Sequence, residues 1–250
     1  MRIAISGSAC QGKSTLITDF LREWDMFTTP EKTYRDHLTE NNLRHSKETN
    51  QKTQWDILNF MVDSLQLYSK GDKVIFDRCP LDNMVYSLWA YEKNINDIDD
   101  DFIKKCIPLV RESLKFLDVI FYIPITKAAP VQIVEDTLRE TDKLYIKEVD
   151  NIFKGIEQQY LQGLKSSPFL PNEECPAIVE IFGNREQRLH MIRQYIDAEG
   201  DLLGENSSTI LGEEVLDMEQ ILRDQQREMY KEKAQADKLM RQIQYTKNRR

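Results

Sequence analysis

The sequence contains no apolar run long enough to cross a membrane. A spanning helix needs about 18 or more consecutive apolar residues, and no segment approaches that length. Glycine and proline are also scarce, with 9 and 8 among 250 residues, which excludes a low-complexity or collagen-like chain. We therefore expect no membrane partner, and we read the apolar start at residues 2–5 as a strand and not as a signal peptide.

Cysteine is scarce, and its four positions match no familiar framework. Cys10, Cys79, Cys106 and Cys175 lie far apart in the sequence and fit no zinc-binding spacing. With 40% hydrophobic residues the chain can bury a core without disulfides. We expect reduced thiols and a cytoplasmic protein, in the host cytoplasm if a phage encodes it. A net charge of −8 argues against a surface devoted to nucleic acid, but it leaves room for a local basic patch.

Short apolar runs alternate with segments of helical periodicity through the first 200 residues. Strands are expected at 2–6, 73–77, 116–124 and 177–182, with a further strand or strand end at 27–31. Helices are expected at 14–24, about 32–44, 49–68, 81–93, 102–114, 131–164 and 187–196. This alternation predicts a three-layer α/β chain with a parallel sheet covered by helices on both faces.

A change in composition after residue 200 predicts a boundary between an α/β domain, 1–204, and a charged helical tail, 205–250. Apolar residues recur every seven positions along the tail, which indicates one apolar stripe on a long helix. They are Val215, Leu222, Met229, Ala236 and Ile243. The tail could pack along its own domain, form a homodimer or bind a partner, or serve as a basic arm that touches DNA.

The strongest motif is the segment 7–14, which satisfies the pattern G-x-x-x-x-G-K-[S/T] between an expected strand and an expected helix. Its glycines let backbone N–H groups point at phosphate oxygens, and the helix start adds its positive end. Lys13 can reach the β- and γ-phosphates, and the Ser14 hydroxyl can ligate Mg²⁺. The residues expected to hold ATP are Gly7, Ser8, Cys10, Gln11, Gly12, Lys13, Ser14 and Thr15.

A second constellation follows the strand at 73–77. Parallel strands beside a P-loop strand end at the ligand, so Asp77 is placed to hold magnesium with Ser14 or to accept a proton, and Arg78 to meet a phosphate. The two charges could instead belong to a structural ion pair. Asp82 begins the next helix, where a role as N-cap and a functional role are both open.

Two further charged residues are candidates for the chemistry of transfer. Glu31 ends the segment 27–31 and is a candidate general base for an acceptor hydroxyl, although a solvated acid at a helix start is an alternative. Arg139 begins a polar helical stretch that could close over the γ-phosphate as a lid and stabilise its charge. A solvated helix with ordinary ion pairs is the alternative there.

These residues resemble the P-loop nucleoside and nucleotide kinase-like group, which includes thymidylate, deoxynucleoside and ribosylnicotinamide kinases. The likeness is strongest to compact phage and bacterial members described as AAA-type ATPases or kinase-like proteins. The segments that carry it are 7–15, 30–35, 77–82, 139–153 and 183–188.

The resemblance implies a role for residues outside the P-loop. It implies that Glu31 and Arg35 face the acceptor, that Arg139 belongs to the lid, and that Arg188 lies near the adenine. The chain lacks the paired lid arginines of deoxynucleoside kinases and the double serine that follows the Asp-Arg pair in thymidylate kinases. The identity of the acceptor therefore does not carry over.

Three functions are compatible with the sequence. The first is an ATP- and Mg²⁺-dependent kinase for a nucleoside, nucleotide or related acceptor, with ATP hydrolysis as a possible side activity. The second is a kinase that acts on a hydroxylated modified base in phage DNA, which the basic tail would support. The third is an ATP-hydrolysing regulator with the tail as its partner surface. Arg78 stands where ring ATPases place a second acid after Asp77, which favours a kinase over a motor.

Overall fold

The computed structural model describes residues 1–41, 43, 46–126, 142–162, 167–171 and 173–203. Arg139 and the tail at 205–250 therefore lie outside the described residues. The elements are, in chain order, β1 (Arg2–Ser6), α1 (Lys13–Glu23), α2 (Tyr34–Glu40), the 3₁₀ turn η1 (Ser46–Glu48), α3 (Gln51–Gln66), β2 (Val74–Asp77), α4 (Pro80–Glu92), α5 (Asp100–Leu114), β3 (Val119–Tyr122), α6 (Lys143–Leu161), β4 (Ala177–Glu180) and α7 (Arg185–Ile192).

The four strands form one parallel sheet in the order β2-β1-β3-β4, as the alternation predicts. Strand β1 lies in the middle, with Ile3 opposite Ile75 of β2 on one side and opposite Val119 of β3 on the other. Its five residues are all buried, which explains its unbroken apolar character. Because the strands are parallel, their carboxyl ends meet at one edge, and the P-loop leaves β1 at that edge.

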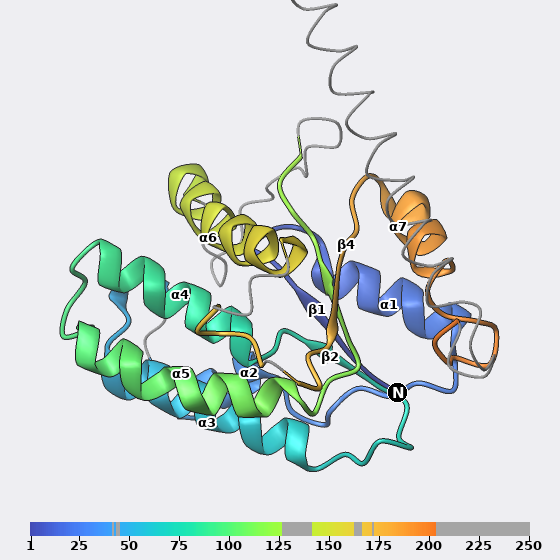
Figure 1. Ribbon diagram of the computed structural model, residues 1–250, viewed down its shortest axis with the longest axis horizontal. Helices are drawn as coiled ribbons and strands as arrows, with labels where there is room; N and C mark the ends of the chain where they lie inside the picture. Colours follow the sequence, from blue (N-terminus) through green and yellow to red (C-terminus); the bar gives the residue numbers. More distant parts are fainter. Residues whose placement is uncertain (42, 44–45, 127–141, 163–166, 172, 204–250) are drawn as a thin grey trace, which may run out of the picture. The chain divides into compact units, whose positions relative to one another are not determined.

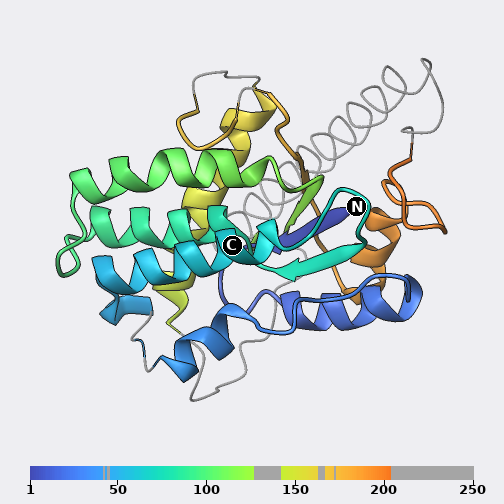
Figure 2. The same cartoon turned by 90° about the horizontal axis from the view of Figure 1, so that it is seen from below.

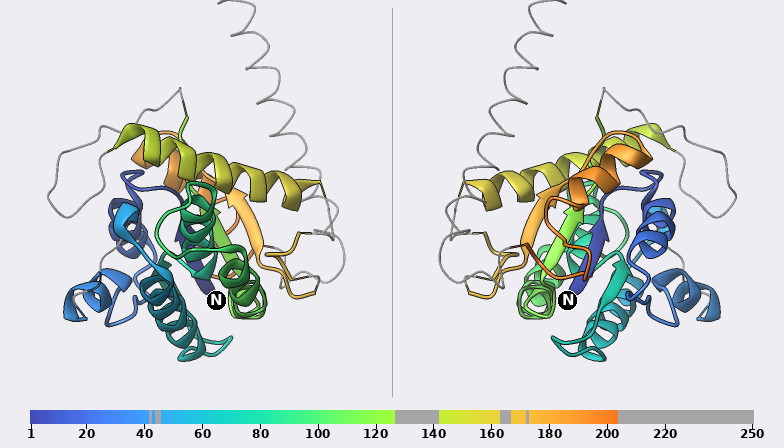
Figure 3. Two further views of the ribbon diagram at one scale, coloured as in Figure 1. Left: turned by 90° about the vertical axis from the view of Figure 1, so that its left-hand side faces the viewer. Right: turned by 90° about the vertical axis from the view of Figure 1, so that its right-hand side faces the viewer.

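Helices cover both faces of the sheet and give the three-layer α/β arrangement of a P-loop kinase fold. Helices α1 and α7 lie on one side, and α3, α4 and α5 lie on the other (Figure 1). Seen from below, α3, α4 and α5 form three neighbouring rows (Figure 2). Helix α6 crosses α4 (Figure 3). This arrangement leaves the P-loop open toward α2, α3 and α4, where the candidate site lies.

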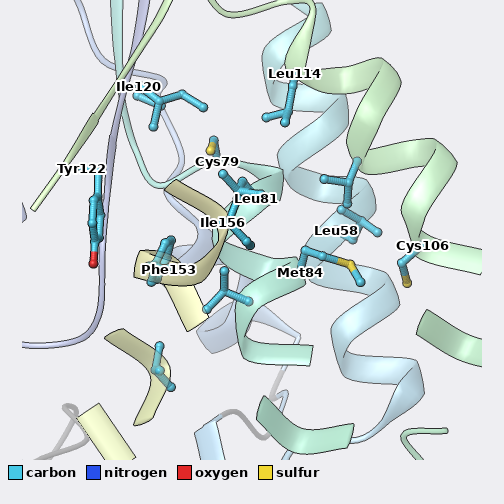
Figure 4. Packing of buried hydrophobic residues seen from close by; sticks show 14 of the residues in the cluster. Leu58, Cys79, Leu81, Met84, Cys106, Leu114, Ile120, Tyr122, Phe153 and Ile156 are labelled. Atoms are coloured by element: carbon cyan, nitrogen blue, oxygen red, sulfur yellow. The ribbon is translucent and has the colours of Figure 1, made fainter. Parts of the chain in front are cut away.

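The main hydrophobic core fills the space between the sheet and the helices α3 to α6. Leu58, Met84 and Cys106 come from three different helices and are all fully buried. Figure 4 shows them facing one another, with Ile120 of β3 and Phe153 of α6 closing the cluster. Burial of each large apolar side chain contributes roughly 1.5–3 kcal/mol, and this packing holds α4 rigidly beside the P-loop.

The expected strand at 27–31 is only a single bridge. Thr28 pairs with Val74 in parallel fashion, its amide donates to the Lys73 carbonyl, and its carbonyl accepts from the Ile75 amide. Pro30 has no N–H to continue the ladder, and the chain turns toward α2 instead. Helix α2 is correspondingly short, at Tyr34–Glu40, where a helix to residue 44 was expected.

No helix in the described part of the chain is both long and apolar enough to cross a membrane. The chain divides into two units, Met1–Asp201 and Leu202–Arg250, and the first is compact. The expected domain boundary at residue 204 lies close to this division and remains a prediction, since the tail beyond it is outside the described residues. The candidate site lies entirely within the first unit.

Candidate functional site

The P-loop occupies the turn between β1 and α1, and its two flanking glycines adopt conformations that other residues rarely take. Gly7 has a φ of 138° and Gly12, the N-cap of α1, a φ of 76°. A Cβ at Gly7 would lie 2.7 Å from the carbonyl oxygen of Ile123, at the end of β3. Glycine is therefore required at position 7 both for backbone freedom and for close packing against the neighbouring strand.

The side chain of Lys13 folds back over this loop. It is 5% exposed, and its Nζ donates to the carbonyl oxygens of Gly7 at 2.9 Å and Ser8 at 2.5 Å. Burial, together with the neighbouring Arg78 guanidinium, lowers the Lys13 pKa to about 7, although the Asp77 carboxylate opposes the shift. A cation held in this way gains stability from any anion that enters the loop.

Ser14 and Asp77 come from different elements and meet beside the P-loop. Ser14 is the second residue of α1, and Asp77 is the last residue of β2. The Ser14 hydroxyl donates a hydrogen bond to Asp77 Oδ2 at 3.2 Å. The other carboxylate oxygen, Oδ1, is buried and has no hydrogen-bond partner among the described residues. A hydroxyl and an unsatisfied carboxylate oxygen are ligands that suit Mg²⁺, so these two residues could hold the ion.

Arg78 adopts the strained backbone conformation of this strand end. Its φ is 81°, and its Nη1 donates to the Gly7 carbonyl and to Asp82 Oδ1, both at 2.9 Å. The guanidinium also lies over the rings of Tyr34 and Tyr86, 5.4 and 5.0 Å from their centroids. The ion pair that the sequence left open is present, with Asp82 as the partner and not Asp77. A role for Arg78 at a phosphate remains a prediction.

Asp82 holds the elements around the P-loop together. It is fully buried at the third position of α4, so it is not the N-cap, which is Cys79. Its carboxylate accepts from Ser6 Oγ at 2.6 Å, from the Gly7 amide at 3.3 Å and from the Cys79 amide at 3.1 Å, in addition to Arg78. The sequence left an N-cap role and a functional role open for Asp82, but it gave no sign of these contacts with Ser6 and Gly7.

A cavity of about 170 Å³ extends from the P-loop into the space between α2, α3 and α4. Its lining combines P-loop residues with apolar and polar side chains of the surrounding helices. Those outside the loop are Tyr34, Arg35, Leu38, Thr39, Gln54, Ile57, Met61, Arg78, Asp82, Asn83, Tyr86 and Tyr145. We call this space the main cavity.

A second cavity of about 260 Å³ lies between α1, α3 and residues 29–35, and it includes Asp77. Tyr34, Arg35 and Arg78 line both cavities and form the wall between them. Ser14 also borders both. The site is therefore larger than a nucleotide pocket alone, with space on both sides of the residues that follow the P-loop.

The structure separates Glu31 from Arg35, two residues that the resemblance places together at the acceptor. Arg35 is half-buried at the start of α2, and its Nε donates to the Tyr34 hydroxyl at 3.1 Å. Glu31 is exposed on the turn before α2 and lines neither cavity. The role of Glu31 as general base stays a prediction that this geometry does not support.

Arg188 lies on α7 and contacts the P-loop from the side opposite to the main cavity's helices. It is 7% exposed, and its Nη1 donates to the Gln11 carbonyl at 2.7 Å. A Cβ at Gly12 would lie 3.3 Å from the same nitrogen. Burial lowers the Arg188 pKa. Arg188 therefore fixes the loop's backbone, and its expected nearness to adenine stays a prediction.

The floor of the main cavity contains an amide pair that sequence reasoning did not identify. Asn83 Nδ2 of α4 lies 2.6 Å from Gln54 Oε1 of α3, and Gln54 Nε2 donates to Thr49 Oγ1 at 2.8 Å. All three residues are buried. The sequence places Gln54 and Asn83 in two consecutive expected helices. Nothing in their spacing indicated that the two amides are buried and line the same cavity.

Comparison with known proteins places the chain in a recognised group. Residues 2–160 match the family described as AAA domain. No curated protein matches the sequence. Among solved structures, the NadR protein in complex with NR aligns with a TM-score of 0.55 and 16% identity, over 82% of this chain and 54% of that chain. The chain thus spans about half the length of that protein.

Two further structures show the same level of likeness. The NadR protein in complex with NAD and AMP-PNP aligns with a TM-score of 0.52 and 17% identity, over 82% of this chain and 51% of that chain. A deoxyadenosine kinase from M. mycoides with bound dCTP aligns with a TM-score of 0.48 and 17% identity, over 77% of this chain and 96% of that chain. At 16% and 17% identity, the likeness to the two NadR structures concerns the fold alone.

Proposed function

This chain belongs to the AAA domain family of P-loop proteins, and from that premise we propose that it is a Mg²⁺-dependent kinase that transfers the γ-phosphoryl group of ATP to a nucleoside, a nucleotide or a related acceptor. The observation that carries the proposal is the main cavity. It begins at the P-loop, where a nucleoside triphosphate binds, and continues between α2, α3 and α4, where a second substrate has room.

The donor half of the site consists of the P-loop and Lys13. Backbone N–H groups of the loop and the first turn of α1 offer hydrogen bonds to phosphate oxygens. Lys13 exchanges its present partners, the carbonyls of Gly7 and Ser8, for phosphate oxygens of higher charge. Arg188 supports this half by holding the Gln11 carbonyl, so that the loop keeps its shape when the anion enters.

Ser14 and Asp77 are the residues that would hold Mg²⁺. The unsatisfied Oδ1 of Asp77 and the adjacent Ser14 hydroxyl fit the ion's preference for oxygen ligands. When bound, the ion neutralises charge that develops on the transferring group. Asp77 also borders the second cavity, and its carboxylate contacts the P-loop through the Ser14 hydroxyl.

The acceptor half is the part of the main cavity beyond the P-loop. Arg35 and Arg78 provide positive charge at its wall, close to where the phosphoryl group is transferred. Leu38, Ile57 and Met61 provide an apolar surface suited to a planar ring. The combination favours a substrate with both an aromatic part and a hydroxyl or phosphate that reaches the γ-phosphate.

The residue that follows Asp77 supports a kinase over a ring motor. A ring ATPase needs a second acidic residue at that position. Arg78 occupies it instead, and its guanidinium pairs with Asp82 and donates a hydrogen bond to the Gly7 carbonyl. The NadR structures, which carry NR in one case and NAD with AMP-PNP in the other, support a related substrate class here. The NadR protein is longer, and the alignments cover only 54% and 51% of its chain. A similar substrate for the present chain is therefore part of the proposal.

The proposal is tested by measuring ADP formation from ATP and Mg²⁺ with a panel of nucleosides, nucleoside monophosphates and ribosylnicotinamide. We expect at least one acceptor to accelerate ADP formation and to yield a phosphorylated product. Lys13→Ala should lower that rate by about 100-fold or more. Lys104→Ala, an exposed lysine on α5, should leave it unchanged. Slow ATP hydrolysis that no acceptor accelerates would refute the proposal.

A further inference from the structure

Asn83 occupies an unusual position at the floor of the main cavity. It lies in the first turns of α4, a few residues after Arg78 in the chain. Its side chain is 3% exposed and lines the cavity. A buried amide normally satisfies both its NH₂ and its oxygen, because leaving one unpaired costs roughly 1–3 kcal/mol. The two ends of the Asn83 amide differ sharply in this respect.

The orientation of the Asn83 amide follows from its neighbours. Nδ2 lies 3.2 Å from the backbone oxygen of Gln54 and 2.6 Å from Gln54 Oε1. A backbone carbonyl can only accept a hydrogen bond, so the end of Asn83 that faces it must be the NH₂ group. Both N–H bonds are then used on Gln54, and the oxygen is the end of the amide that Gln54 leaves unpaired.

The Asn83 oxygen is the unsatisfied end of this amide. Oδ1 is buried and accepts no hydrogen bond among the described residues. Two other hydroxyls of α4, those of Ser87 and Tyr86, are also buried without a partner in the described part of the chain, but Ser87 does not line the cavity. The Tyr86 hydroxyl lines it and can donate as well as accept, whereas Asn83 Oδ1 can only accept.

We infer that Asn83 selects the acceptor substrate, and that its Oδ1 accepts a hydrogen bond from an N–H group on the substrate's planar ring. The group would be an exocyclic amino group, a ring imide N–H or a carboxamide NH₂. Oδ1 can only accept, so a ring without such a donor leaves this buried oxygen unsatisfied when it fills the cavity. The inference rests on the proposed function in one respect, the placement of the acceptor in this cavity.

The direct test is isothermal titration calorimetry of the whole chain with the P-loop filled by AMP-PNP and Mg²⁺. Matched pairs in which one member lacks the donor are titrated: adenosine against purine riboside, cytidine against pyrimidin-2-one riboside, thymidine against 3-methylthymidine, and ribosylnicotinamide against the riboside of 3-acetylpyridine. We expect the donor-bearing member of at least one pair to bind about 10- to 100-fold more tightly. Equal binding within every pair, or no binding by any, would overturn the inference.

Variants separate Asn83 from the rest of the helix. Asn83→Leu should bring the two members of the discriminating pair to within about 3-fold of each other, whereas Ser87→Ala should keep the wild-type ratio. Retained discrimination in Asn83→Leu would overturn the inference. If that variant does not fold, the titrations of the ligand pairs with wild-type protein still test the inference. Calorimetry needs no turnover, so a donor preference without product would refute the kinase function and leave this inference standing.

Discussion

The buried carboxylate of Asp82 accepts a hydrogen bond of 2.6 Å from the Ser6 hydroxyl, which ties the first turn of α4 to the residue directly before the P-loop. The same carboxylate neutralises Arg78, which is 6% exposed. Asp82→Ala would leave that guanidinium buried without its anion. We expect a loss of about 3–5 kcal/mol in the free energy of unfolding, measured by urea denaturation.

The matched control for Asp82 is Asp100, which also lies in the first turn of a helix and pairs with a cation four residues later. That pair is exposed, so solvent screens it and competes for both partners. Asp100→Ala should leave the urea midpoint nearly unchanged. Equal effects of the two substitutions would show that Asp82 is an ordinary capping residue and not the link between α4 and the P-loop.

Asp77 and Glu31 are the two carboxylates proposed for the chemistry, and the structure ranks them. Asp77 borders the site and contacts Ser14, whereas Glu31 is exposed and lines neither cavity. We expect Asp77→Asn to lower kcat by about 100-fold or more and to shift the Mg²⁺ dependence to higher concentration. Glu31→Gln should lower kcat by less than about 5-fold. The reverse order in steady-state assays would restore Glu31 as the base.

The depressed pKa of Lys13 predicts a proton linked to nucleotide binding. In the free protein burial lowers this pKa to about 7, and a bound polyphosphate must raise it because the anion favours the charged amine. Above pH 7 binding therefore takes up a proton, and affinity for ADP should fall as pH rises from 7 to 9, by at most about 10-fold per pH unit. Below pH 7 Lys13 is already protonated and contributes no pH dependence.

This proton uptake is measured by calorimetry at pH 8 in two buffers of different ionisation enthalpy. Wild-type protein should show up to one proton taken up per ADP bound. Lys13→Met removes the titrating group, so its weaker binding should show no such uptake. An identical buffer dependence in both proteins would mean that another group titrates and that Lys13 stays charged throughout.

Arg188 is expected to act on ATP binding through the backbone of the P-loop. Arg188→Met preserves most of the side-chain volume but removes the 2.7 Å hydrogen bond to the Gln11 carbonyl. We expect the KM for ATP to rise by about 10-fold with little change in kcat. Arg193→Met, at the other end of α7 and paired with Glu23, is the control. A fall in kcat at constant KM would instead place Arg188 in the chemical step.

The parts of the site that lie within one short segment were predictable from the sequence. Gly7, Lys13 and Ser14 belong to a contiguous motif whose strand and helix context is also local. The proximity of Asp77 to the P-loop was also predictable, because the parallel arrangement brings the end of β2 beside the end of β1. Its role in catalysis stays a prediction. Local patterning also located all four strands and the helices from α3 to α5.

Features that depend on packing between distant segments were not predictable. The hydrogen bond between Ser6 and Asp82 joins residues 76 positions apart, and that between Gln54 and Asn83 joins residues 29 apart. Neither pair has a spacing that indicates contact. The expected strand at 27–31 failed for a related reason: apolar and β-branched residues favour a strand there, but ladder formation stops after Thr28, ahead of Pro30.

The central claim is that the γ-phosphoryl group moves to an acceptor and not to water. ATP labelled with ¹⁸O in its γ-phosphoryl oxygens tests this directly when it is incubated with the chain, Mg²⁺ and the acceptor that best accelerates ADP formation. The account predicts that mass spectrometry finds the labelled phosphoryl group on the acceptor, in amounts equal to the ADP formed. Labelled inorganic phosphate as the sole phosphorylated product would contradict it.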